Sequence, residues 1–132
     1  MIRDERGTVT AFVASFVVAL LAVAGLVADG GFVLAAKRQA ADEAEAAARA
    51  GAQALDEDAL RRGGTVALDT AAARGRALDY LAVTGHRGTV EVAGDSVRVE
   101  VSFERHLTLL GMFGMGPVPV SGIGEAHGVR GP

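Results

Sequence analysis

Charged residues are absent from one long stretch near the start of the chain. This stretch runs from Thr8 to Ala28 and is followed directly by Asp29. As an α-helix it would be about 31 Å long, close to the roughly 30 Å hydrocarbon core of a bilayer. The pattern therefore predicts a short N-terminal segment at residues 1–7 and a transmembrane helix at residues 8–28.

The same stretch permits a second interpretation, as a signal peptide. Signal peptides carry a shorter apolar region and a clearly positive start, whereas here two acidic residues offset the two basic residues before the stretch. Ala22-Val23-Ala24 nevertheless has the small-x-small form that signal peptidase cuts. The length favours a retained anchor, and a secreted soluble domain released near Ala24 is the alternative.

Basic residues flank the predicted span on both sides, so the positive-inside rule alone does not give its orientation. Beyond Arg38 the chain is rich in acidic residues and contains most of the protein. We expect a single-pass protein of the cytoplasmic membrane, with its N-terminus inside and its C-terminal domain extracytoplasmic.

Small residues recur every three or four positions along the predicted span, which places them on one helical face. They are Ala11, Ser15, Ala19 and Ala22. In a bilayer, such a face allows another helix to approach closely. The general abundance of alanine in this chain is the alternative explanation.

Alanine dominates the next segment, and alanine is the best helix former. We expect an alanine-rich stem helix at residues 29–62, in which Gly30 and Gly31 either kink the chain or allow one continuous rod. Small and apolar residues also follow helical spacing here: Ala36, Ala40, Ala44, Ala47, Gly51 and Leu55.

Residues 63–132 are predicted to form a small extracytoplasmic α+β domain. A second helix is expected at Ala71–Ala82, capped by Asp69 or Thr70 and stopped by Gly85. The residues expected to share one face of this helix are Ala71, Gly75, Leu78 and Ala82.

Beyond Gly85 the apolar residues change from helical to alternating spacing. Two valine-rich runs flank Gly94-Asp95, which suits a two-residue hairpin turn. The segment PVPVSGIGEAH predicts a third strand, and Pro119 favours an edge position for it. The predicted fold class is α+β, with a long N-terminal helix, a second helix and a small three-stranded antiparallel sheet covered on one face.

Composition limits the chemistry. The net charge of −3 gives no electrostatic basis for nucleic-acid binding. The chain has no cysteine, which excludes disulfides, thiolate catalysis and cysteine-ligated metal sites. No nucleophile or cofactor motif is present either, so we expect a structural or assembly protein with no enzymatic activity, cofactor or small-molecule substrate.

The segment ERGTVTAFVASFVVALLAVAGLVADGGFVLAAKRQAADEAEAAARAGAQAL resembles the N-terminal module of TadE/TadG-like proteins, which belong to the Flp (tight-adherence) pilus systems of bacteria. The matching features are Arg6-Gly7, the GLVADGG of Gly25–Gly31 and the alanine-rich run at Ala35–Ala52. The segment VRVEVSFERHLTLLGMFGMGPVPVSGIGEA is similar to the short C-terminal sheet of this group. The Gly- and Ala-rich style resembles that of actinobacterial proteins.

The resemblance implies a membrane-anchored minor pilin or pseudopilin with a pilin-like fold, carried by a Flp pilus or an allied secretion system. Its partners would be other pilus or secretion-system subunits, contacted through the N-terminal helix. The resemblance also points to Gly7-Thr8 as a prepilin cleavage position, but a cut there puts Phe12 where prepilins usually have a glutamate. The uncut TadG-like branch therefore fits better, and a single-pass envelope scaffold or sensor unrelated to pili is the alternative.

Two further sets of residues invite interpretation. Asp29 either pairs with a charge on a partner or marks the membrane exit, where a charge is hydrated again. His86, His106 and His127 are too scattered to predict a metal site.

Two short segments complete the candidates. Gly111–Gly116 resembles a phosphate loop only superficially, and we expect a turn whose neighbouring apolar residues form a plug: Leu109, Leu110, Met112 and Phe113. Asp56–Arg62 is most simply a solvated helix end, with a weak cation site on its carboxylates as the alternative.

Overall fold

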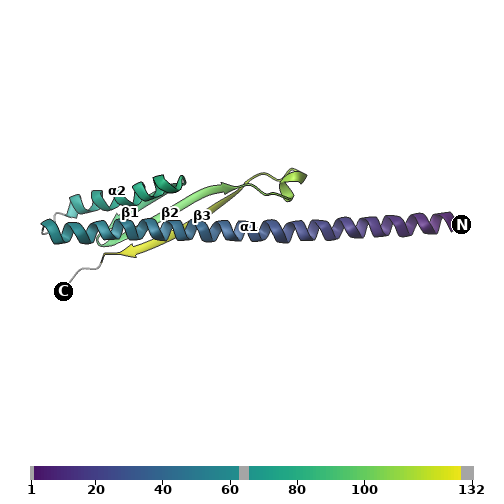
Figure 1. Cartoon of the computed structure of the whole chain (residues 1–132), viewed down its shortest axis with the longest axis horizontal. Helices are drawn as coiled ribbons and strands as arrows, with labels where there is room; N and C mark the ends of the chain where they lie inside the picture. The colour runs from purple at the N-terminus through teal and green to yellow at the C-terminus, as the bar shows by residue number, and fades with distance from the viewer. Residues whose placement is uncertain (1, 63–65, 129–132) are drawn as a thin grey trace.

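The structure, a computed structural model, describes residues 2–62 and 66–128, and the side chains of residues 5–55 and 70–128. Its elements are α1 (Ile2–Arg62), α2 (Val66–Thr84), β1 (Arg87–Ala93), β2 (Ser96–Arg105), the 3₁₀ helix η1 (Leu110–Phe113) and β3 (Val118–His127). The expected α+β class, with a long first helix, a second helix and a three-stranded antiparallel sheet, is confirmed (Figure 1).

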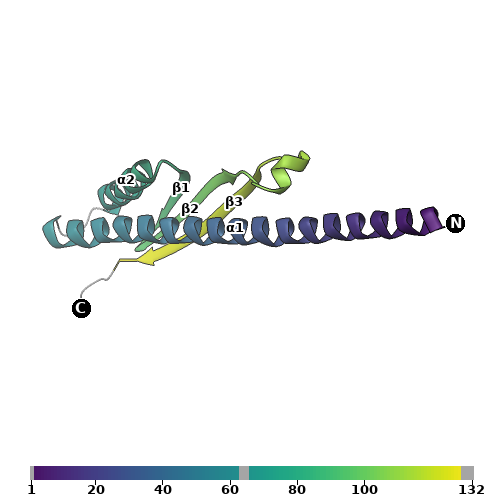
Figure 2. The same ribbon diagram turned by 45° about the vertical axis from the view of Figure 1, so that its right-hand side comes forward.

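Helix α1 runs without interruption through Gly30 and Gly31. Each glycine costs a helix interior about 1 kcal/mol relative to alanine, but the alanine-rich flanks and the absence of proline before residue 117 leave nothing that breaks the helix. The continuous rod is therefore the alternative that the structure supports. Both ribbon views show its N-terminal half projecting far beyond the sheet (Figures 1 and 2).

The sheet has the order β1-β2-β3, and both pairings are antiparallel. Ala93 pairs with Ser96, so Gly94 and Asp95 form the two-residue turn that the sequence predicts. Gly94 has a φ of +60°, a conformation that glycine adopts without a steric penalty. Among the described strands, β3 pairs only with β2, and it carries Pro119, so the predicted edge position is also confirmed.

Both helices cover the same face of the sheet. Alternate strand residues point inward and are buried: Val90, Val97, Val99, Val101 and Val120. They pack against the α1 stripe predicted from the sequence, every member of which is buried. The opposite face of the sheet is open and mostly polar. The result is a two-layer domain whose core consists chiefly of valine and alanine.

Glycines in β3 allow the sheet to contact the α1 backbone directly. A Cβ at Gly122 would overlap the backbone of Ala40 and Ala41, and one at Gly124 would overlap that of Ala44 and Glu45. Because the facing positions of α1 are alanines, helix and strand meet without intervening long side chains. This contact fixes where the sheet lies along α1.

The second helix differs from the prediction. It begins at Val66, so Asp69 and Thr70 lie inside it and are not its cap. The buried residues are Ala73, Ala77 and Leu81, whereas the predicted face turns outward, with Ala71, Leu78 and Ala82 exposed. Both sets have helical spacing, and in an alanine-rich helix small apolar residues line more than one face. The predicted stop is correct: Gly85 follows Thr84 with a φ of +76°, and its N–H donates to the Leu81 carbonyl.

Candidate membrane helix and its junction with the domain

The N-terminal half of α1 has no packing partner in the described part of the chain. Residues 5–24 are all exposed. The large apolar side chains among them are Val9, Phe12, Val13, Phe16, Val17, Val18, Leu20, Leu21 and Val23. Helix α1 is long enough and apolar enough to cross a membrane. A rod of exposed apolar side chains on this scale is unfavourable in water and indicates burial in lipid or against other helices.

The small residues of the exposed half and the buried stripe lie on one continuous face of α1. From Ala22 the spacing continues by three and four residues through Gly25 and Asp29 to Ala36. The domain covers this face from Gly25 onward and leaves it open between Ala11 and Ala22. The small-residue face therefore packs against the sheet in the C-terminal part of α1, whereas its N-terminal part, from Ala11 to Ala22, is exposed.

Asp29 joins α1 to the loop that connects β2 with β3. Its Oδ1 accepts hydrogen bonds from the N–H of Thr108 at 3.1 Å and of Leu109 at 3.3 Å. Its Oδ2 accepts from Leu109 at 3.1 Å and from Leu110 at 2.6 Å. The first N–H groups of a helix lack partners inside that helix. Asp29 therefore caps η1 from a different element of the chain.

The Asp29 carboxylate is buried, with only 1% of the residue exposed. The expectation that it is hydrated is wrong, because the backbone of its own chain supplies the solvation that water was expected to supply. The Leu110 N–H, followed by those of Leu109 and Thr108, lowers the pKa of Asp29 below its ordinary value, while burial acts in the opposite direction. Sequence reasoning missed this junction, although the position of Asp29 within the small-residue face was a signal for it.

The segment after this junction differs from the predicted plug. Gly111–Gly116 forms a turn built on η1, as expected, but Met112 and Phe113 are 81% and 82% exposed. Leu109 and Met115 are also exposed, with Leu109 lying over Gly25 of α1. Within this segment the N–H groups of Met112, Gly114 and Met115 donate to backbone carbonyls of the same turn, as expected for a turn rather than a phosphate loop.

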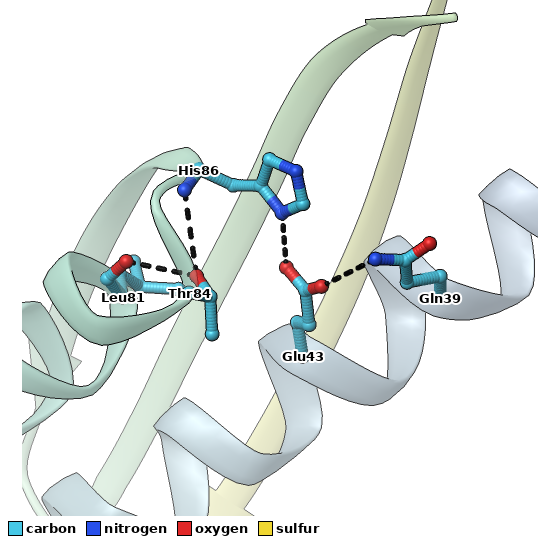
Figure 3. A network of polar contacts seen from close by, with 5 residues as sticks. All are labelled: Gln39, Glu43, Leu81, Thr84 and His86. Atoms are coloured by element: carbon cyan, nitrogen blue, oxygen red, sulfur yellow. Dashed lines mark hydrogen bonds and ion pairs between the residues drawn. The ribbon is translucent and has the colours of Figure 1, made fainter.

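A second polar cluster joins α1 to the start of β1 (Figure 3). His86 Nδ1 lies 2.6 Å from Glu43 Oε2, and Gln39 Nε2 donates to Glu43 Oε1 at 2.9 Å. The His86 ring also stacks on Phe103, with ring centroids 4.2 Å apart. These contacts give His86 a structural role that the sequence pattern did not indicate, since its partners lie far away in the chain.

The histidines do not join acidic side chains into a metal site in the described part of the chain. No group of three His, Asp or Glu side chains there is arranged to hold a metal ion. His86 and His127 each lie within 4.0 Å of a glutamate oxygen, Glu43 and Glu125 respectively. The side chains of Asp56–Arg62 lie outside the described set, so the cation site considered there is not addressed by the structure.

Comparison with known protein families gives a match to the first helix. Residues 7–54 match the family model Tad, whose description is "Putative Flp pilus-assembly TadE/G-like". The matched region contains the exposed half of α1, Asp29 and most of the stripe buried under the sheet. The resemblance seen in the sequence is thereby confirmed over this region. No curated protein and no solved structure matches the chain significantly.

Proposed function

We propose that this chain, whose first helix is similar to TadE/G-like Flp pilus-assembly proteins, is a membrane-anchored structural component of a Flp pilus or an allied secretion system. The supporting observation is that the region matched by the family contains the exposed, uncharged half of α1 together with most of the stripe buried under the sheet. A protein that serves as a minor pilin or pseudopilin needs such a helix, because it must be held in the membrane and must also contact its neighbours.

The proposed span is Thr8–Ala28, in the cytoplasmic membrane, with the N-terminus inside and the domain outside. Charged residues flank this span on both sides of the sequence, at Arg3–Arg6 before it and at Lys37–Arg38 after it. We also propose that the chain stays uncut at Gly7-Thr8. Both residues lie within α1, and Phe12 stands where a processed pilin would carry its glutamate.

The partner surface proposed for assembly is the open part of the small-residue face, at Ala11, Ser15, Ala19 and Ala22. Close packing of helices in lipid depends on van der Waals contact and interhelical hydrogen bonds, which small side chains permit. The neighbouring subunit would place its own helix along this face, in the way that the sheet lies along the same face further on.

The test exchanges small residues for leucine. Ser15→Leu with Ala19→Leu fills the proposed groove and keeps the segment apolar. Val13→Leu with Val17→Leu places two leucines on the opposite side of α1. We expect both variants to resist carbonate extraction. Only the Ser15/Ala19 variant should lose co-purification with pilus or secretion subunits.

Two outcomes would contradict the proposal. If both variant pairs recover the same partners, the face has no role in assembly, and a single-pass envelope scaffold or sensor becomes the better assignment. If carbonate releases the unmodified protein, the helix is not a membrane anchor at all.

A further inference from the structure

The loop between β2 and β3 carries a concentrated group of exposed apolar side chains. We call them the apolar tip: Leu109, Met112, Phe113 and Met115. They lie within one short segment around η1, at the end of the sheet that points along α1 toward the N-terminus (Figure 1). No described residue covers Met112 or Phe113, and such a cluster on a small domain marks a contact surface.

The apolar tip has a fixed place relative to the proposed span. The Asp29 carboxylate holds the backbone of Thr108, Leu109 and Leu110 against α1. The Leu109 side chain lies over Gly25, within the last turn of the uncharged run. Insertion of the span therefore carries the tip to the membrane without any other movement of the domain.

The distribution of exposed charge defines the depth of the tip. Between Arg6 and Lys37 the only charged residue is Asp29, and it is buried. The length of α1 without an exposed charge is therefore about 30 residues, or about 45 Å. A bilayer is about 30 Å thick in its hydrocarbon core and about 40–45 Å with both headgroup regions included. With the proposed span Thr8–Ala28 centred in the hydrocarbon core, Gly25 lies about 10 Å and Asp29 about 16 Å from the midplane. The tip, which is held at both residues, therefore lies between the outer part of the core and its boundary with the headgroups.

We propose that the apolar tip is a second membrane contact, in which Met112, Phe113 and Met115 enter the boundary between headgroups and acyl chains of the outer leaflet. The inference rests on the proposed membrane anchor. Lipid is the occupant because the tip is continuous with the exposed apolar surface of the span on the same chain. Arg105 adds charge complementarity: its guanidinium lies 5.9 Å from the Phe32 ring, where it can reach lipid phosphates.

A two-point attachment has a structural consequence. A single helix leaves a domain free to rotate about the helix axis, whereas an inserted tip fixes which side of the domain faces the membrane. The tip would also hold α1 at a defined tilt, because tilt is set by interfacial anchors rather than by span length.

The experiment uses tryptophan as a local probe, since the chain has none. Phe113→Trp places it in the tip. Val83→Trp is the control, at an 88% exposed position on α2. This control position lies far from the proposed membrane surface. Three residues after Val83, His86 contacts Glu43 of α1, and Glu43 lies about 21 Å further from the proposed span than Asp29 does. Each full-length variant is reconstituted in phosphatidylcholine vesicles, with or without acyl-chain bromination.

We expect blue-shifted emission from Phe113→Trp and loss of most of that emission in brominated vesicles. Val83→Trp should keep its emission there and be quenched by acrylamide in water instead. If the two tryptophans show the same emission and quenching in protein that floats with the vesicles, the inference about the tip is overturned, whereas the proposed membrane anchor still stands. Blue-shifted emission without quenching by bromine would also overturn it, because a second copy of the chain would then cover the tip. Failure to float with vesicles would contradict the proposed anchor itself.

Discussion

Asp29 illustrates how a charged side chain is accommodated next to an apolar helix. Removal of a carboxylate from water is costly unless hydrogen bonds replace the lost hydration. Here three consecutive backbone N–H groups provide them, from Thr108, Leu109 and Leu110. The same interaction satisfies N–H groups that η1 cannot satisfy itself. One residue therefore removes a charge from the surface of α1 and positions a loop.

Asp29→Asn should weaken this junction without unfolding the domain. The amide keeps one acceptor oxygen but turns an NH₂ group toward N–H donors, so part of the capping is lost. Hydrogen bonds to charged groups are worth roughly 1.5–3 kcal/mol, and we expect a local loss of about 2 kcal/mol. Hydrogen exchange at the amides of Thr108, Leu109 and Leu110 measures it directly, as a rate increase of roughly 30-fold.

The control for this change is Asp42→Asn, at an exposed position of the same helix. This variant should leave the exchange of these three amides unchanged.

The pH dependence of the same junction gives a further prediction. In the wild type, protection of the amides of Thr108, Leu109 and Leu110 should be constant between about pH 5 and 8. The pKa of Asp29 is lowered, so its contribution to stability is complete above the ordinary carboxyl pKa and is lost only as the pH falls through the folded value, below about pH 4. Unchanged exchange in Asp29→Asn would show that the carboxylate does not hold the loop.

At the scale of elements, periodicity predicts a structure only where one face differs clearly from the others. The stripe of α1 stands out from charged neighbours such as Lys37, Arg38 and Asp42, and its prediction is correct. In α2, Leu78 and Leu81 each continue an alanine series, so spacing alone did not distinguish the buried face. The hairpin was predictable because Gly94-Asp95 separates two alternating runs. The position of Asp29 in the small-residue face indicated burial, but the partners of Asp29 and His86 lie far away in the chain, so no local pattern identifies them.

The contact of β3 with α1 gives a prediction at this scale. Gly124→Ala places a methyl group where the backbone of Ala44 and Glu45 already lies, so the strand must move away from the helix. Overpacking of this kind costs about 1–3 kcal/mol, and we expect the upper end because backbone atoms cannot rotate aside. Chemical unfolding followed by circular dichroism in detergent measures the loss.

Gly116→Ala is the matched control for this variant. It lies in the connection before β3, has no atom within 4 Å of the added methyl group and has no positive φ. It should leave the free energy of unfolding nearly unchanged. Equal stability of the two alanine variants would mean that β3 does not lie as close to α1 as the structure has it.

At the scale of the whole molecule, one helix serves two environments. Its C-terminal half completes the core of an α+β domain, and its N-terminal half carries an apolar surface that the described part of the chain leaves exposed (Figure 2). The rod continues between the halves without a break, so a displacement or rotation of one half is transmitted to the other. In an assembly, packing of the N-terminal halves would thereby fix the positions of the domains.

Orientation is the property of the whole molecule that labelling can test, because the chain has no cysteine of its own. Asp95→Cys, in the exposed hairpin turn, reports on the domain, and Glu5→Cys reports on the segment before the span. A membrane-impermeant maleimide should modify Cys at position 95 on intact cells whose wall admits it, and Cys at position 5 only after lysis. The opposite pattern would reverse the orientation. If the mature protein carries no label at position 5 even after denaturation, that segment has been removed, and a cleaved signal peptide or a processed prepilin would replace the uncut anchor.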